Sequence, residues 1–214
     1  MSQTILQYLT TRNLNLSVEI PEPTYTTHDA WGPVESIQPW LDFTYDVLVN
    51  RFREVLRLPI DPFNYPSAFE NAQLNIITSE PSFDIALAGN IAKVSSALHK
   101  TKKSLFLGAG SRIIKDQSWG RPDWGAGDST IRYADRPDIC QGIVCGDTKV
   151  LWDPREASKF VNDKREHYER LPSKRNAVSP FEQVQHYCQQ WATRYGFIIT
   201  DKVLGGCSFK VVTS

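Results

Sequence analysis

The alternation of hydrophobic and polar residues predicts main elements in the order helix, strand, strand, strand, helix, strand, with one helix before them and one more strand after them. Apolar residues at helical spacing occupy residues 43–58, 83–100 and 179–195. Apolar stretches bounded by turn residues, which are typical of strands, occupy residues 103–114, 121–134, 141–152, 197–200 and 207–212. Helices that alternate only loosely with strands favour a mixed α/β fold, in which helices flank a mixed central β-sheet.

Several boundaries are marked by particular residues. Ser179 followed by Pro180 is typical of an N-cap and the first helical position, and Gly196 is typical of a helix stop. Charged residues 155–170 are predicted to be helical, and residues 72–80 form either a short strand or the lead-in to the next helix.

Proline-rich residues 1–40 are predicted to form an irregular arm or cap on a single domain of residues 41–214. No apolar window reaches membrane-spanning length, and the N-terminus lacks the pattern of a signal peptide. The four cysteines form no C-x-x-C pair and the histidines have no zinc-ligand spacing. We therefore expect an intracellular protein, cytoplasmic or nuclear, with reduced thiols and no membrane partner.

The net charge is zero, but the charges are unevenly distributed along the chain. Residues 1–99 carry 5 Lys and Arg against 11 Asp and Glu, whereas residues 100–214 carry 19 against 13. A basic second half suits an anionic partner such as nucleic acid, although surface charge also fluctuates along any chain.

The sequence "GDTK" places an unusual pair of charges at the end of an apolar strand. Strand side chains alternate between faces, so Asp147 and Lys149 share one face and Thr148 points to the other. Asp123, in "RPDW", begins the preceding strand. If the two strands pair, both carboxylates and the carbonyl of Thr148 offer the hard oxygen ligands that Mg²⁺ prefers. A surface Asp–Lys pair on a strand would show the same triplet.

Two further features bear on this site. Gln183 and Tyr187 are spaced i, i+4 and share a helix face, where they either contact the site or simply flank the apolar stripe. A second "RPD" ends at Asp138, only nine residues before Asp147. That spacing leaves little room for a strand to turn and pair, so the first "RPD" is favoured.

The motifs "RPDW", "GDTK", "QVQHY" and "RYGFIITD" together resemble the PD-(D/E)XK nuclease superfamily, and more closely a fungal group of nuclease-like domains. The resemblance covers about residues 80–201. It implies a restriction-endonuclease-like core with a mixed four-stranded sheet, and phosphodiester hydrolysis that depends on Mg²⁺ or Mn²⁺. Carried over, Asp123 and Asp147 are metal ligands, Lys149 is the catalytic lysine, and Gln183 and Tyr187 are accessory residues.

The resemblance also implies an acidic residue on the helix before the first core strand. Glu80 is the preferred residue for this role, and Asp84, Glu70 and Glu54 remain alternatives. The leading hypothesis is a metal-dependent nuclease acting on nucleic acid, with DNA favoured. The rival hypothesis is a non-catalytic module of the same fold that binds nucleic acid or protein, for example in an effector or a self/non-self recognition system.

Overall fold

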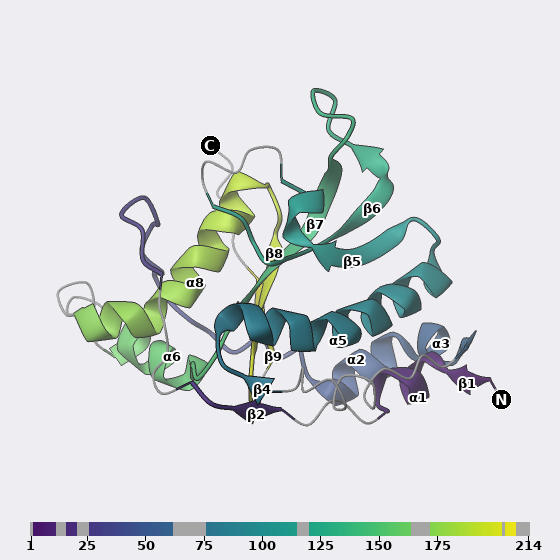
Figure 1. The fold of residues 1–214 in the computed structure, drawn as a ribbon, viewed down its shortest axis with the longest axis horizontal. Helices are drawn as coiled ribbons and strands as arrows, with labels where there is room; N and C mark the ends of the chain where they lie inside the picture. Colours follow the sequence, from purple (N-terminus) through teal and green to yellow (C-terminus); the bar gives the residue numbers. More distant parts are fainter. Residues whose placement is uncertain are drawn as a thin grey trace.

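The structure is a computed structural model that describes residues 2–11, 16–20, 26–61, 76–114, 120–163, 172–202 and 204–208. These residues form a mixed α/β fold in which helices flank a central five-stranded sheet (Figure 1). The predicted class, a mixed sheet covered by helices, is confirmed.

The central sheet has the strand order β5-β6-β7-β8-β9. The strands are Leu105–Ala109 (β5), Trp124–Arg132 (β6), Cys140–Lys149 (β7), Tyr195–Thr200 (β8) and Leu204–Ser208 (β9). Only β7 and β8 pair in parallel, and the other neighbours are antiparallel. The sheet has five strands instead of the expected four, because the segment after β8 returns as an antiparallel edge strand.

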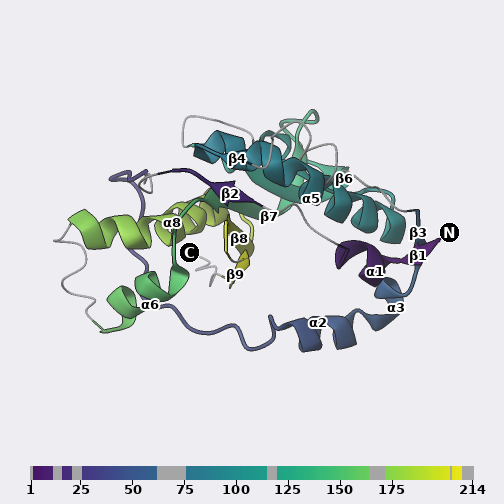
Figure 2. The same ribbon diagram turned by 60° about the horizontal axis from the view of Figure 1, so that its bottom comes forward.

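Helices cover the two faces of the sheet. Helix α5 (Glu80–Thr101) packs on one face, and α8 (Pro172–Gln190) packs on the other together with α6 (Pro154–Asp163) (Figures 1 and 2). Alternate strand residues contribute to the two cores, with Ile198 packed on the α8 side and Phe197 and Ile199 on the α5 side. All four cysteines are free and buried, and they belong to the α8-side core.

Helix α5 begins at Glu80, three residues before the apolar periodicity of residues 83–100. The hydroxyl of Ser79 accepts a hydrogen bond from the Ser82 amide, and the Ser82 hydroxyl accepts one from the Ser79 amide, which forms a capping box. Within the predicted apolar stripe, Leu87 and Ile91 are buried against the sheet. The early start matters because it makes Glu80 the first residue of the helix.

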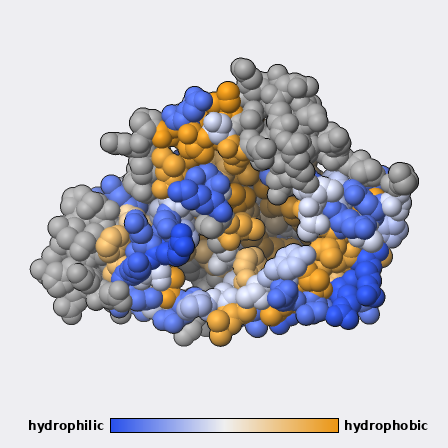
Figure 3. Space-filling view, turned by 90° about the horizontal axis from the view of Figure 1, so that it is seen from below, coloured by the Kyte–Doolittle hydropathy of each residue, from blue (hydrophilic) through white to orange (hydrophobic). Residues whose placement is uncertain are grey.

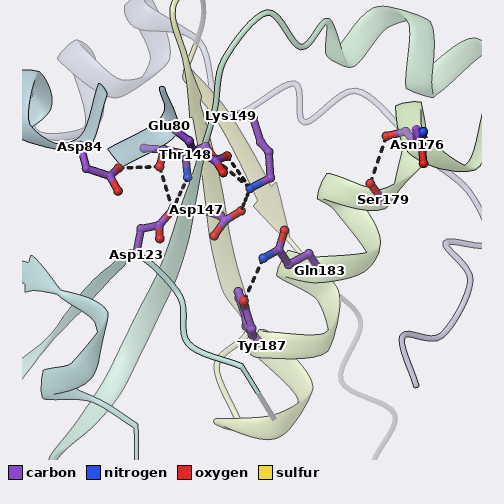
Figure 4. A network of polar contacts seen from close by, with 10 residues as sticks. All are labelled: Glu80, Asp84, Asp123, Asp147, Thr148, Lys149, Asn176, Ser179, Gln183 and Tyr187. Atoms are coloured by element: carbon purple, nitrogen blue, oxygen red, sulfur yellow. Dashed lines mark hydrogen bonds and ion pairs between the residues drawn. The ribbon is translucent and has the colours of Figure 1, made fainter. Parts of the chain in front are cut away.

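Helix α8 differs from the prediction at both ends. It starts at Pro172, so Pro180 lies inside the helix and Ser179 is not its N-cap. Pro180 has no N–H for the carbonyl of Asn176, and the hydroxyl of Ser179 donates to that carbonyl instead, at 3.0 Å (Figure 4). The helix ends at Gln190, and Ala192, with φ of 52°, makes the left-handed turn that was expected at Gly196.

Among the described residues before α5, all elements are short. Strand β1 (Gln3–Thr4) pairs with β3 (Pro59–Ile60), β2 (Ser17–Val18) pairs with β4 (Ile76–Ile77), and α1 (Ile5–Leu9) follows β1. The single helix predicted over residues 43–58 is interrupted at Phe52 and forms α2 (Tyr45–Arg51) and α3 (Arg53–Leu56). Its predicted apolar face is not buried, since Tyr45 and Phe52 are 63% and 49% exposed.

The underside of the molecule is hollowed, and hydrophobic side chains border the hollow (Figure 3). A cavity of about 660 Å³ lies between α5, the sheet and the segment around Trp40 and Phe43. No helix in the described segments has both the length and the apolar character that a membrane span requires.

Candidate active site

Strand pairing brings Asp123 and Asp147 together. Trp124 pairs with Gly146 in the antiparallel ladder of β6 and β7, which places Asp123 beside Asp147 at the end of the sheet. The short helix η1 (Gly110–Arg112) supports Asp123 from behind, because the Gly110 amide donates to the Asp123 carbonyl at 2.9 Å. The predicted pairing of these two strands is confirmed.

The alternation along β7 is also as predicted. Asp147 lies opposite Ile198 on the α8 side of the sheet, whereas Thr148 lies opposite Ile199 on the α5 side. Asp147 and Lys149 share a face, and the Lys149 Nζ lies 2.5 Å from the Asp147 Oδ2. Both side chains are almost fully buried, so this is an ion pair removed from water.

Lys149 has two further partners. Its Nζ lies 2.9 Å from the Glu80 Oε1 and donates to the Thr148 carbonyl at 2.9 Å (Figure 4). Glu80, the preferred acidic residue, therefore reaches the site by pairing with the lysine. The Thr148 carbonyl, expected to bind metal, already accepts a hydrogen bond, which leaves one lone pair on that oxygen.

Asp84 joins the same site one turn after Glu80. The Thr148 hydroxyl lies 2.5 Å from the Asp84 Oδ1 and 2.7 Å from the Asp123 Oδ2 (Figure 4). A hydroxyl has one hydrogen and cannot donate to two ionised carboxylates at once. The Thr148 amide also donates to the Asp123 Oδ2 at 2.9 Å, so Asp123 has a second donor in Thr148. The Thr148 hydroxyl is therefore free to donate its hydrogen to Asp84.

Burial and neighbouring charges shift the pKa values of the groups in this site. Burial raises the pKa of Asp84 to about 6, opposed by its hydrogen bond to Thr148 and reinforced by the carboxylates of Asp123 and Glu80. Burial also raises the pKa of Asp147 well above its usual range, against the opposing effect of Lys149. Burial lowers the pKa of Lys149, but the charges of Asp147 and Glu80 outweigh it and raise that pKa overall.

Gln183 and Tyr187 lie on α8 and face the Asp147–Lys149 pair (Figure 4). The Gln183 Nε2 donates to the Tyr187 hydroxyl at 2.8 Å, and both side chains are buried. Burial and the charge of Asp147 raise the pKa of Tyr187. Among the described residues, the buried Oε1 of Gln183 has no hydrogen-bond partner. Gln183 thus brings an unused acceptor to the edge of the site.

The structure separates the remaining alternatives from this site. Glu54 is exposed on α3, and Glu70 lies outside the described residues. Asp138 lies in the β6–β7 hairpin, where its carboxylate binds the Arg136 guanidinium at 2.8 Å. The first "RPD", not the second, therefore contributes its aspartate to the site. We call the group of Glu80, Asp84, Asp123 and Asp147 the carboxylate cluster.

The carboxylate cluster suits a hard divalent cation in chemistry but is not assembled around one. Asp84, Asp123, Asp147 and Glu80 supply oxygen ligands and an excess of negative charge, which fits Mg²⁺ or Mn²⁺. Within the described part of the chain, no three Asp, Glu, His or Cys side chains are grouped closely enough to hold a metal ion as they stand. Binding would require Thr148 to release one of its two carboxyl partners.

Sequence reasoning overlooked Gly110 and ranked Asp84 below Glu80. A Cβ on Gly110 would lie 1.9 Å from the Pro122 carbonyl oxygen, so only glycine allows η1 to approach the "RPD" segment. The signal for Asp84 was its spacing of four residues from Glu80, which places both carboxylates on one helix face. The contact of Gly110 with Pro122 depends on the tertiary fold and leaves no signal in the local sequence "GAGSR".

Comparison of the chain with models of known protein families, with curated proteins and with solved structures found no match.

Proposed function

We propose that the chain is a metal-dependent nuclease with a restriction-endonuclease-like core of the PD-(D/E)XK type. One observation carries the proposal: Asp123, which directly precedes β6, meets the Asp147–Lys149 pair of β7 at one end of the sheet. Glu80 from the preceding helix completes the set that the motifs predicted.

The residues that would hold Mg²⁺ or Mn²⁺ are Asp123 and Asp147, with Asp84 and Glu80 as the acidic residues supplied by α5. A bound divalent ion would supply Lewis-acid polarisation of the scissile phosphate and a water of lowered pKa. The cost of placing several carboxylates together in a buried site supports this assignment, because a cation relieves that cost.

Lys149 is the residue proposed to act on the reacting phosphate. Its ammonium has three donors and no acceptor, so it offers charge and hydrogen bonds and is not a metal ligand. A buried, preorganised cation stabilises negative charge that grows on the phosphate oxygens in the transition state. Asp147 and Glu80 hold that ammonium in place at 2.5 and 2.9 Å.

Gln183 and Tyr187 are proposed to orient this charged pair. Their mutual hydrogen bond fixes the Gln183 amide with its Oε1 unused and buried beside the site. An unsatisfied buried acceptor costs free energy, so a donor from a water or the substrate would stabilise it. The basic second half of the chain supports nucleic acid as the substrate, with DNA favoured.

A non-catalytic module that binds nucleic acid or protein is the second candidate. The observation that favours it is the closed network around Lys149, whose ammonium is already bound to Asp147, Glu80 and the Thr148 carbonyl. In that case the charges would stabilise the fold and take no part in chemistry.

The test is cleavage of plasmid, linear and single-stranded DNA, and of RNA, with Mg²⁺, Mn²⁺ or EDTA. We expect metal-dependent cleavage by the wild type and a loss of roughly a hundred- to a thousand-fold in Lys149→Ala. Lys159→Ala, which removes an exposed lysine on α6, is the control and should cleave normally. If the wild type binds these substrates but cleaves none of them with any metal, the result would support the non-catalytic module instead.

A further inference from the structure

A polar cavity lies at the C-terminal end of α5, whereas the carboxylate cluster lies at the N-terminal end of that helix. Its volume is about 570 Å³, and it is bounded by the last turns of α5, strand β5 and helix η1. Helix α5 has 22 residues, so its two ends are about 30 Å apart. The cavity is therefore a separate feature from the proposed active site.

The lining of this cavity is basic and rich in hydroxyl groups. Four basic side chains and four serines border it, against one carboxylate, that of Asp61. His99 and Lys100 belong to the last turn of α5, where positive charge also stabilises the helix dipole. Lys103 and Arg112 lie outside that helix, and the helix dipole does not account for them. The inference therefore rests on these two residues.

Lys103 and Arg112 are available to a ligand. No ion pair of either residue occurs within the described segments, whereas the neighbouring Lys102 is bound to Asp128 at 2.5 Å. The Arg112 guanidinium carbon lies 3.7 Å from the centre of the Phe106 ring. This stacking holds the guanidinium by its face, so that its N–H groups remain directed outward in the plane of the group.

Serine hydroxyls complete the donor set. The Ser95 Oγ accepts a hydrogen bond from the Leu107 amide of the edge strand at 3.1 Å. This contact fixes the oxygen and leaves the hydroxyl hydrogen for another acceptor. Ammonium, guanidinium and hydroxyl donors around one cavity match an anion with several oxygens better than any neutral ligand.

We infer that this cavity binds the phosphate group of a nucleotide, either free or as part of a strand. The volume is within the range of ordinary small-molecule sites, about 300–1,000 Å³. Arginine and lysine beside hydroxyl donors recognise phosphate by charge and by paired hydrogen bonds. This inference does not depend on the proposed nuclease activity, because binding needs neither the carboxylate cluster nor a metal.

The test is binding in EDTA, which prevents cleavage, with inorganic phosphate, adenosine monophosphate and a fluorescent single-stranded oligonucleotide as probes. The double variant Lys103→Ala/Arg112→Gln is compared with Lys159→Ala/Arg194→Gln, which removes the same two residue types from exposed positions elsewhere. We expect the first variant to bind at least about tenfold more weakly than the wild type, and the control to be unchanged.

The probes distinguish the two sources of the phosphate. Loss of monophosphate binding would identify a free nucleotide, and loss of oligonucleotide binding alone would identify a strand. Thermal melting checks that both variants fold. If the double variant Lys103→Ala/Arg112→Gln does not fold, the single variant Lys103→Ala replaces it. Equal affinities of the two variants for all three probes, or no binding by the wild type, would overturn the inference.

Discussion

At the scale of single residues, Thr148 connects the two halves of the site. Its hydroxyl lies between Asp84 on α5 and Asp123 before β6, and its side chain is fully buried. Thr148 points away from the face that carries Asp147 and Lys149, and its hydroxyl thus connects α5 to the segment that precedes β6. The motif "GDTK" therefore has a structural role at its third position, beside the chemical role that we propose for its second and fourth.

Replacing Thr148 with valine should destabilise the metal-free protein by about 1–3 kcal/mol, because it leaves buried carboxyl groups without their hydroxyl partner. Urea unfolding measures the change. Thr130→Val is the control, since the Thr130 hydroxyl also bonds a carboxylate, that of Asp128, but from an exposed position. The control should stay within about 0.5 kcal/mol of the wild type. Equal losses in the two variants would contradict the central position given to Thr148.

Asp84 should give the protein an unusual dependence of stability on pH. Its pKa is raised from 3.8 to about 6, so the folded state holds this proton more tightly than the unfolded state. The stabilisation is fully present below about pH 4 and is lost as the pH rises through about 6.

Asp84→Asn should therefore be more stable than the wild type at pH 7 without metal, by about 1 kcal/mol, since partial exposure screens the charge. The two proteins should be alike at pH 4. Asp138→Asn is the control and should gain nothing at pH 7, because its salt bridge to Arg136 lowers the pKa of Asp138 instead. Melting curves across this range would refute the assignment if Asp84→Asn were the less stable protein at pH 7.

At the scale of elements, the site depends on how closely η1 approaches the "RPD" segment. Gly110 donates to the Asp123 carbonyl and has no room for a side chain, because of the Pro122 backbone. Gly108, two residues earlier in β5, has ordinary space around the position of a Cβ. The two glycines therefore form a matched pair.

Gly110→Ala should cost about 1–3 kcal/mol of stability, because the Pro122 backbone would have to shift and carry Asp123 with it. Gly108→Ala should be close to neutral. Chemical denaturation of both variants measures the difference. If Gly110→Ala were tolerated as well as Gly108→Ala, η1 would not position Asp123.

The elements differ in how well sequence predicted them, for physical reasons. Alternation along β7 was predictable because it depends only on strand geometry. The start of α8 was not, because Ser179 and Pro180 form a typical helix start in isolation. In the fold, the Ser179 hydroxyl satisfies the Asn176 carbonyl and the helix continues through the proline.

At the scale of the whole molecule, long-range contacts limited the prediction. The mixed sheet and the meeting of Asp123 with Asp147 followed from assuming that neighbouring strands pair. The bond between Thr148 and Asp84 joins residues 64 positions apart and had no sequence signal. The exposed face of α2 was missed because periodicity predicts an apolar face without showing what covers it.

Binding of a divalent ion should stabilise the fold, because it relieves repulsion among the acidic groups of the site. Millimolar Mn²⁺ should raise the melting temperature of the wild type, and EDTA should reverse the rise. The shift should be absent in Asp147→Asn and present in Asp138→Asn, whose carboxyl lies in the distant hairpin. A melting temperature that does not respond to Mn²⁺ would count heavily against a metal site.

The most direct measurement of the central claim compares cleavage by two variants that each neutralise the aspartate of an "RPD" motif. Asp123→Asn changes the residue that lies beside Asp147, and Asp138→Asn changes the one paired with Arg136 at the hairpin. With Mg²⁺ or Mn²⁺, we predict that Asp123→Asn abolishes cleavage of nucleic acid while Asp138→Asn retains it. If Asp123→Asn cleaved nucleic acid at the wild-type rate, this result would contradict the site that we assign.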